Sequence, residues 1–306
     1  MQPIHGIFLK LCSVVILVVM SSIIKAYSQD VPAGQAVFFR SFFAIPVILI
    51  WVTLRGEFSS GLRVNSVMSH VWRGGIGTCA MGLYFSSLGM LPLPEVMAIG
   101  YAAPLLVVIL AAIFLGEKVR GFRITAVVVG LIGVLIVLSP RLSAFGSEVD
   151  ERAQIGAMVV LASALFVAIS QIVVRKIVDT EHTAAIVFYY SIISSILALC
   201  TAPFGWTMPG AEVFLMLILA GLMGGVGQIF LTTSYRHADV SVIAPFDYAS
   251  MILALLIGYF VFDEVPTLIM LSGASLVISA GVFIIWREHK LGLERAKQRK
   301  AATQGG

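Results

Sequence analysis

Long apolar runs, interrupted by short polar stretches, follow one another along almost the whole chain. We distinguish ten such runs, each close to the roughly 20 residues that an α-helix needs to cross a bilayer. They lie near residues 7–24, 35–54, 73–90, 95–115, 122–139, 155–175, 183–202, 212–234, 241–261 and 267–286. None alternates between apolar and polar residues as the strands of a membrane barrel do, so we expect an all-α polytopic membrane protein with ten transmembrane helices.

The chain also repeats itself, which predicts two related five-helix units. Residues 6–25 align with residues 156–175 at an offset of 150, and Tyr101 aligns with Tyr248 at an offset of 147. Because five is odd, the second unit must enter the membrane from the opposite side, which makes a 5+5 inverted repeat of the kind found chiefly in transporters. The expected divisions are a first repeat over 1–140, a linker over 141–154, a second repeat over 155–287 and a basic tail over 288–306.

Composition and charge support a membrane location and indicate an orientation. The chain is 59% hydrophobic and 12% charged, whereas soluble domains carry about 25% charged residues. Its net charge of +4 equals the balance of residues 287–306 alone, so we expect contact with the lipid bilayer and no nucleic-acid partner. Lysines and arginines number sixteen on one side and three on the other. The positive-inside rule then places both termini in the cytoplasm of a bacterial-type inner membrane and the linker in the periplasm.

Enzyme chemistry finds little support in the sequence. Cys12, Cys79 and Cys200 lie far apart inside apolar runs, so neither a disulfide framework nor a metal site is expected. The five histidines fall in loops or at helix ends, and no hydrolase or metalloprotease motif occurs. The glycine clusters around residues 75 and 225 lack the spacing of a phosphate loop. We expect no cofactor, and a membrane-embedded enzyme remains the rival hypothesis of a different class.

Charged side chains inside the apolar runs are candidate functional groups, because such residues are costly in a membrane. Arg40 and Glu95 could pair with each other or contact a polar or anionic solute; alternatively, Arg40 could reach the outer headgroups. Asp247 could take up a proton during coupling, or it could be structural and bind Arg236 or a helix end. Glu95 and Asp247 are therefore the coupling candidates.

Polar aromatic residues and prolines complete the candidate site. Tyrosines can stack on a flat solute and bond to its edges. Tyr101 and Tyr248 are the first choices because they occupy equivalent positions in the two repeats. Pro104 and Pro245 are expected to break the fourth and ninth helices, which would free backbone carbonyls near a central site. The predicted substrate-binding residues are Tyr101, Tyr248, Tyr84, Arg40, Gln228 and Tyr190.

The sequence resembles the drug/metabolite transporter superfamily, in its ten-helix EamA branch. The resemblance rests on Leu-Pro-Leu-Pro-Glu at 91–95 and Phe-Leu-Gly-Glu at 114–117, and on Ile-Ala-Pro-Phe-Asp-Tyr at 243–248 followed by Phe-Asp-Glu at 262–264. It implies a secondary transporter of a small organic metabolite that works by alternating access.

The identity of the solute is a separate question. Phe39-Arg40 and residues 101–104 look most like the bacterial riboflavin importers, so riboflavin or a similar flat polar metabolite is the predicted solute. An exporter of amino acids, other metabolites or drugs is the alternative. The direction of transport, its coupling and a homodimeric state stay open.

Overall fold

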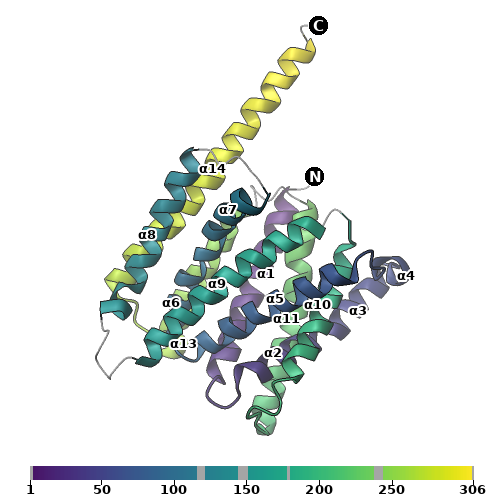
Figure 1. The fold of residues 1–306 in the computed structure, drawn as a ribbon, viewed down its shortest axis with the longest axis vertical. Helices are drawn as coiled ribbons and strands as arrows, with labels where there is room; N and C mark the ends of the chain where they lie inside the picture. The colour runs from purple at the N-terminus through teal and green to yellow at the C-terminus, as the bar shows by residue number, and fades with distance from the viewer. Residues whose placement is uncertain (1–2, 116–120, 144–150, 178–179, 238–243, 305–306) are drawn as a thin grey trace.

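The computed structural model describes residues 3–115, 121–143, 151–177, 180–237 and 244–304, and these residues form helices without any strand. The helices make one bundle, and the end of α14 projects from it (Figure 1). In chain order they are α1 (Pro3–Ala26), α2 (Ala33–Phe42), α3 (Ala44–Leu54), α4 (Phe58–Gly61), α5 (Val67–Leu88), α6 (Leu93–Gly100), α7 (Ala102–Leu115), α8 (Gly121–Ser143), α9 (Glu151–Ile177), α10 (Thr183–Leu199), α11 (Ala211–His237), η2 (Ala244–Tyr248), α13 (Ala249–Phe262) and α14 (Leu268–Gln304). The all-α prediction is confirmed.

Each expected span corresponds to a helical segment, but three of the spans are interrupted. The second divides into α2 and α3 at Phe43, the fourth into α6 and α7 at Tyr101, and the ninth begins as the 3₁₀ helix η2. Proline has no N–H to donate to the carbonyl four residues earlier. For Pro46 and Pro104 that carbonyl belongs to the last residue of the preceding helix, so each proline explains where a break falls. The break at Pro46 was not expected from the sequence.

The outer surface of the bundle is apolar, as a lipid environment requires. Seven described helical segments are long and apolar enough to cross a membrane, and residues 183–199 and 246–262 form shorter apolar helices. The remaining span, α5, has 22 residues and carries His70 and Arg73 within it. Large side chains such as Phe260 (74% exposed) and Leu215 (62% exposed) face outward. In water these exposed side chains would be a liability, whereas in lipid they are solvated.

The two repeats are related by an approximate two-fold axis. Helix α1 runs away from the end of the bundle that carries the N-terminus, whereas its counterpart α9 runs towards it (Figure 1). Helix α1 packs along α11 and α5 packs along α9, which is the same contact with the repeats exchanged. Equivalent helices also touch each other, α2 with α10 and α8 with α14, and the rings of Tyr101 and Tyr248 lie 4.9 Å apart. Contacts between equivalent parts mark the axis.

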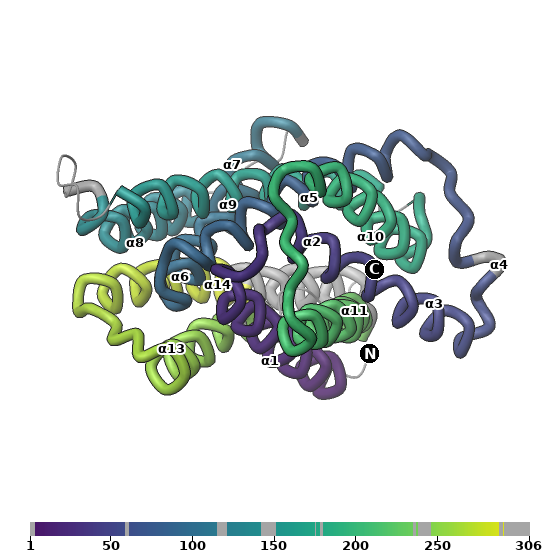
Figure 2. The backbone as a smooth tube through the Cα atoms, turned by 90° about the horizontal axis from the view of Figure 1, so that it is seen from below, coloured from purple at the N-terminus to yellow at the C-terminus, as the bar shows by residue number. Residues whose placement is uncertain are grey.

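Glycines allow the two repeats to approach closely along this axis. A Cβ atom on Gly221 of α11 would lie 2.5 Å from the Phe39 carbonyl oxygen of α2. A Cβ atom on Gly133 of α8 would lie 2.7 Å from the Gly273 carbonyl oxygen of α14. Helices that meet backbone to backbone need small residues at the crossing. Figure 2 shows that the α8–α14 pair lies on one side of the molecule and α3, α4 and α10 on the other.

The expected linker lies only partly within the described residues, and the expected tail is helical. Helix α8 runs to Ser143 and α9 begins at Glu151, so residues 144–150 of the expected linker lie outside the described residues. Helix α14 continues without a break through the basic tail to Gln304. The last transmembrane helix therefore extends beyond the bundle, which the charge pattern of the tail did not indicate (Figure 1).

Candidate functional site

A cavity of about 460 Å³ lies between the two repeats. Helices α1, α2, α5 and α6 contribute its walls from the first repeat, and α9, α10, α11, η2 and α13 contribute from the second. Its polar lining consists of Ser21, Arg40, Arg73, Tyr84, Ser170, Gln171, Tyr190, Gln228, Asp247 and Ser250. A second cavity of about 370 Å³ adjoins it and shares Tyr84, Gln171 and Asp247 with it. Together they have the size of a pocket for a small organic molecule.

Two arginines line the larger cavity and share one aromatic ring. The guanidinium carbons of Arg40 on α2 and Arg73 on α5 lie 5.8 Å and 4.2 Å from the ring centroid of Tyr190 on α10. Arg40 is only 6% exposed, and its Nε has no hydrogen-bond partner. The Nε and Nη1 atoms of Arg73 are likewise buried without a partner. Among the described residues, no carboxylate forms an ion pair with either arginine.

An ion pair joins α1 of the first repeat to η2 of the second. Lys10 of α1 places its Nζ 2.7 Å from Oδ1 of Asp247 in η2. The lysine side chain is 1% exposed, whereas the aspartate side chain is 45% exposed and borders both cavities. Lys10 is therefore a partner for Asp247 that the sequence did not suggest, where Arg236 or a helix end had been considered. The Asp247 carboxylate is therefore accessible to a solute from the cavities, while Lys10 balances its negative charge.

Of the predicted ligands Tyr84, Tyr101 and Tyr248, the first two border a cavity and the third does not. Tyr84 borders both cavities, and its hydroxyl donates a hydrogen bond to Oγ of Ser21 at 3.4 Å. The Tyr101 hydroxyl donates to the carbonyl oxygen of Asp247 at 2.7 Å and borders the smaller cavity. Tyr248 borders neither cavity, because its hydroxyl fills the space that a side chain at Gly281 would occupy. The equivalent tyrosines thus meet each other on the axis.

The structure brings together some of the residues expected from the sequence and separates others. Arg40, Tyr84, Tyr190 and Gln228 line the larger cavity, and Pro104 borders the smaller one with Tyr101. The residues other than Pro104 stay predicted solute ligands. The side chain of Pro245 lies outside the described residues.

The expected pairing of Arg40 with Glu95 is not present. Glu95 forms an ion pair with Arg141 of α8 at 3.0 Å, and it borders neither cavity. Arg40 is buried beside Tyr190 and does not reach the headgroups. The reason is geometric: Arg40 of α2 lies against Tyr190 of α10, whereas Glu95 of α6 lies against Arg141 of α8.

Two charged residues that approach or line the cavities were missed by sequence reasoning. Lys10 and Arg73 were both counted as charges flanking the membrane. Helix α5 begins at Val67, so Arg73 lies almost two turns inside it, and Lys10 lies two turns inside α1. A charge within a helix, rather than at its end, is the signal that would have identified them.

Polar contacts link helix ends at the end of the bundle opposite the termini. Lys25 at the end of α1 forms an ion pair with Glu264 at 2.8 Å and donates to the carbonyl oxygens of Leu88 and Leu91. The second carboxylate oxygen of Glu264 accepts a hydrogen bond from the Leu93 N–H at 2.8 Å. We call Lys25, Glu264 and these three backbone groups the clamp. It ties together the ends of α1, α5, α6 and α13.

Comparison with known proteins places this architecture in a family. The EamA-like transporter family matches residues 4–139 and again residues 154–287, one match for each repeat. A crystal structure of another protein superposes with a TM-score of 0.67 at 18% sequence identity, covering 94% of this chain and 98% of that one. The second likeness concerns the fold alone.

Similar curated proteins carry different transport names. The chain is 28% identical over 256 residues to an S-adenosylmethionine uptake transporter of Rickettsia felis, covering 84% of each protein. It is 26% identical over 276 residues to a pseudopaline exporter of Pseudomonas aeruginosa, covering 90% of this chain and 94% of the exporter. It is also 26% identical over 261 residues to a riboflavin transporter of Rhizobium johnstonii, covering 84% and 82%.

Proposed function

Because this chain belongs to the EamA-like transporter family, we propose that it moves a small organic metabolite across a bacterial inner membrane by alternating access. It is a multi-pass membrane transporter and not an enzyme. The observation that carries the proposal is the cavity of about 460 Å³ that both repeats enclose. Two equivalent units around one pocket can exchange conformations, so that the pocket opens to one side and then to the other.

The cavity is large enough for a small metabolite, and its lining suits more than one candidate solute. Riboflavin remains the candidate that the sequence favours, and tyrosines together with Gln228 would suit a flat polar ring. The similar proteins named for S-adenosylmethionine and pseudopaline are as close in identity as the riboflavin transporter. A solute panel must therefore include all three compounds and several amino acids.

The test is transport by purified protein in proteoliposomes, measured with each labelled solute in both directions. We expect saturable flux of at least one solute. A pair of neighbouring variants supplies the control: Val14 is 6% exposed and lines the cavity, whereas Val15 is 44% exposed on the outer surface. Val14→Trp should fill the cavity and abolish flux, and Val15→Trp should leave it unchanged. No flux of any solute by correctly assembled protein, or equal flux from both variants, would contradict the proposal.

Asp247 is the proposed site of ion coupling, because its carboxylate is open to both cavities and lies against Lys10. Glu95 is the weaker candidate, since it is paired with Arg141 away from the cavities. A proton on Asp247 would release Lys10, which changes the charge next to the solute. If transport is driven by a pH gradient, Asp247→Asn should retain exchange of solute across the membrane but lose acceleration by the gradient. Unchanged acceleration would exclude Asp247.

A further inference from the structure

We propose that the transported solute carries an oxyanion, a carboxylate or a phosphate, and that Arg40 and Arg73 bind it over the ring of Tyr190. This inference rests on the proposed function and names the chemical class of the solute for the same cavity. It follows from the charges that line the cavity and from the lack of a carboxylate partner for two of them among the residues that the structure describes.

The charge balance of the site points to an anion. The charged residues that border the two cavities are Lys10, Arg40, Arg73 and Asp247. Lys10 and Asp247 form an ion pair with each other, so their charges cancel. Arg40 and Arg73 have no carboxylate partner among the described residues, and three of their nitrogen atoms are buried without a hydrogen bond. Charges in such positions cost free energy unless something else compensates them.

The arrangement of the arginines suits an oxyanion. A guanidinium is a planar fork of N–H donors that matches a carboxylate or phosphate, and it stacks on aromatic rings. Both guanidinium groups lie over one ring, which comes from the other repeat, and both line the open space of the cavity. Two cations near one ring repel each other, and an anion between them relieves that repulsion. The ring alone supplies too little compensation for two buried cations.

Two glycines make room for these side chains. A Cβ atom at Gly77 would collide with Nη1 of Arg73 and lie 2.7 Å from Cε2 of Tyr190. A Cβ atom at Gly224 would lie 3.2 Å from Nε of Arg40. Arg73 therefore lies along the surface of its own helix α5 where Gly77 has no side chain, and Arg40 lies against α11 where Gly224 has none.

The remainder of the lining limits the rest of the solute. Apart from its polar groups the wall is apolar, with Met20, Met81, Phe85 and Met97 among its members. The Asp247 carboxylate would repel a second negative charge placed near it. The expected solute therefore has one anionic end and an apolar or aromatic body.

The experiment compares pairs of compounds that differ only in the anionic group. Flavin mononucleotide and riboflavin form the phosphate pair, cinnamate and cinnamamide form the carboxylate pair, and inorganic phosphate is added alone as a third probe. Binding to the full-length protein in nanodiscs is measured by calorimetry. We expect the anionic member of at least one pair to bind tenfold or more tightly than its neutral partner. Absence of any such preference in the wild-type protein overturns the proposal, and this comparison needs no variant.

Variants then assign the preference to the arginines. Loss of a charge-assisted hydrogen bond corresponds to about a 10- to 100-fold loss of affinity, so Arg40→Gln and Arg73→Gln should each remove most of the preference for the anion. Arg40→Lys and Arg73→Lys should retain part of it. Arg55→Gln is the matched control, because Arg55 stacks on Trp51 at 5.0 Å and borders neither cavity. A preference that survives both glutamine variants, or that Arg55→Gln also removes, overturns the assignment.

Failure of this inference can be told apart from failure of the proposed function. If proteoliposomes carry riboflavin while no anion is preferred, the transporter stands and the anionic solute is wrong. If anions bind through Arg40 and Arg73 but no compound of the panel is carried, the anion site stands and transport is in doubt. If the protein prefers the anionic member in only one of the two pairs of compounds, that pair shows whether the site takes a phosphate or a carboxylate.

Discussion

Charged side chains within the helices account for most of what is specific to this site. A charge inside a membrane protein is tolerated where it faces the interior and finds a partner. Lys10 and Asp247 satisfy this requirement with each other, whereas Arg40 and Arg73 lie over the ring of Tyr190 without a carboxylate partner among the described residues. The first pair is therefore balanced by the protein itself, and the second pair can be balanced by the anionic solute proposed above.

The Lys10–Asp247 pair allows a double-mutant test at this scale. Lys10→Met should remove the ion-pair partner of the Asp247 carboxylate and lower the free energy of unfolding by about 1–2 kcal/mol, because this carboxylate is 45% exposed and stays partly solvated. Adding Asp247→Asn removes the unpaired charge, so the double variant should recover most of that loss. Reversible unfolding in detergent measures the two single variants and the double variant. Losses of Lys10→Met and Asp247→Asn that simply add up in the double variant would mean that the pair contributes no interaction of its own.

The sequence identified part of this site because a polar residue stands out in an apolar run. Arg40, Tyr84, Tyr190 and Gln228 were selected in this way, and they line one cavity. Tyr248 was selected by its equivalence to Tyr101, but equivalent residues can meet on the symmetry axis instead of facing the cavity. A helix that is apolar on all sides gives no periodicity from which to tell these two directions apart.

At the scale of the elements, polar groups at helix ends hold neighbouring helices together. Glu181, in the connection before α10, accepts hydrogen bonds from the backbone N–H groups of Asn65 and Ser66 at the start of α5. At the other end of the bundle, the clamp links α1 to α6 and α13. The ten spans themselves follow from hydrophobic length, which the sequence displays directly. The break between α2 and α3 was missed because the effect of Pro46 on the carbonyl of Phe42 had not been considered.

Glu181 makes the stability of the α5 start dependent on pH. Burial raises the pKa of this carboxyl, but the N–H groups of Asn65 and Ser66 and the nearby His70 outweigh that effect and lower the pKa. Its contribution should therefore be complete above the unfolded value of about 4.3 and disappear as the pH falls through the lower folded value. Glu181→Gln should lower the free energy of unfolding at pH 7 by about 1–2 kcal/mol.

The measurement for Glu181 is the melting temperature of wild type and Glu181→Gln between pH 7 and pH 3. The two curves should converge at the acidic end, because the protonated acid resembles the amide. Curves that stay parallel over the whole range would show that the ionised carboxylate does not provide the stability.

The clamp can be tested with two glutamate variants at the same end of the bundle. Glu264 is paired with Lys25 and is 17% exposed, whereas Glu212 accepts a hydrogen bond from Tyr27 at an exposed position. Glu264→Gln should lower the free energy of unfolding by about 3 kcal/mol because it leaves Lys25 without its counter-charge. Glu212→Gln should change it by less than about 0.5 kcal/mol. Thermal unfolding in detergent compares the two, and equal effects would argue against the clamp.

At the scale of the whole molecule, the cavity and the clamp follow from one arrangement. Two inverted units place their equivalent helices in contact along an axis and leave a cavity between them. The clamp joins helix ends at the end of the bundle opposite the termini. In a two-fold arrangement, contacts that join helix ends at one end predict a second state in which equivalent contacts form at the opposite end, as alternating access requires.

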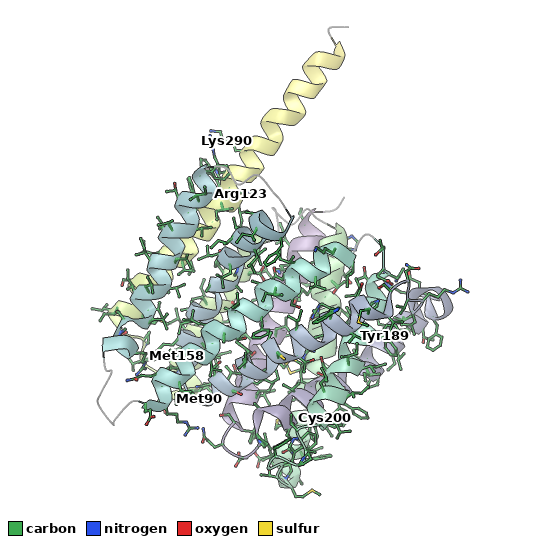
Figure 3. All side chains as sticks on the ribbon, in the orientation of Figure 1. Met90, Arg123, Met158, Tyr189, Cys200 and Lys290 are labelled. Carbon is green, nitrogen blue, oxygen red and sulfur yellow. The ribbon has the colours of Figure 1, made fainter. Side chains whose placement is uncertain are left out.

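The orientation in the membrane is the remaining property of the whole molecule, and one native cysteine can report it. Lys10 and Arg73 lie inside helices, which reduces the sixteen basic residues of the N-terminal side to fourteen, still against three. We therefore expect the termini in the cytoplasm. Cys200 follows α10 at the end away from the termini and is exposed, whereas Lys290 lies at the other end (Figure 3).

In a Cys12→Ala, Cys79→Ala background, a membrane-impermeant maleimide should label Cys200 from outside intact spheroplasts. With Cys200 also replaced by alanine, a Lys290→Cys variant should react only after the membrane is permeabilised. The reverse pattern would place the termini outside. It would leave the repeat and its cavity as they are but assign the clamp to the cytoplasmic end.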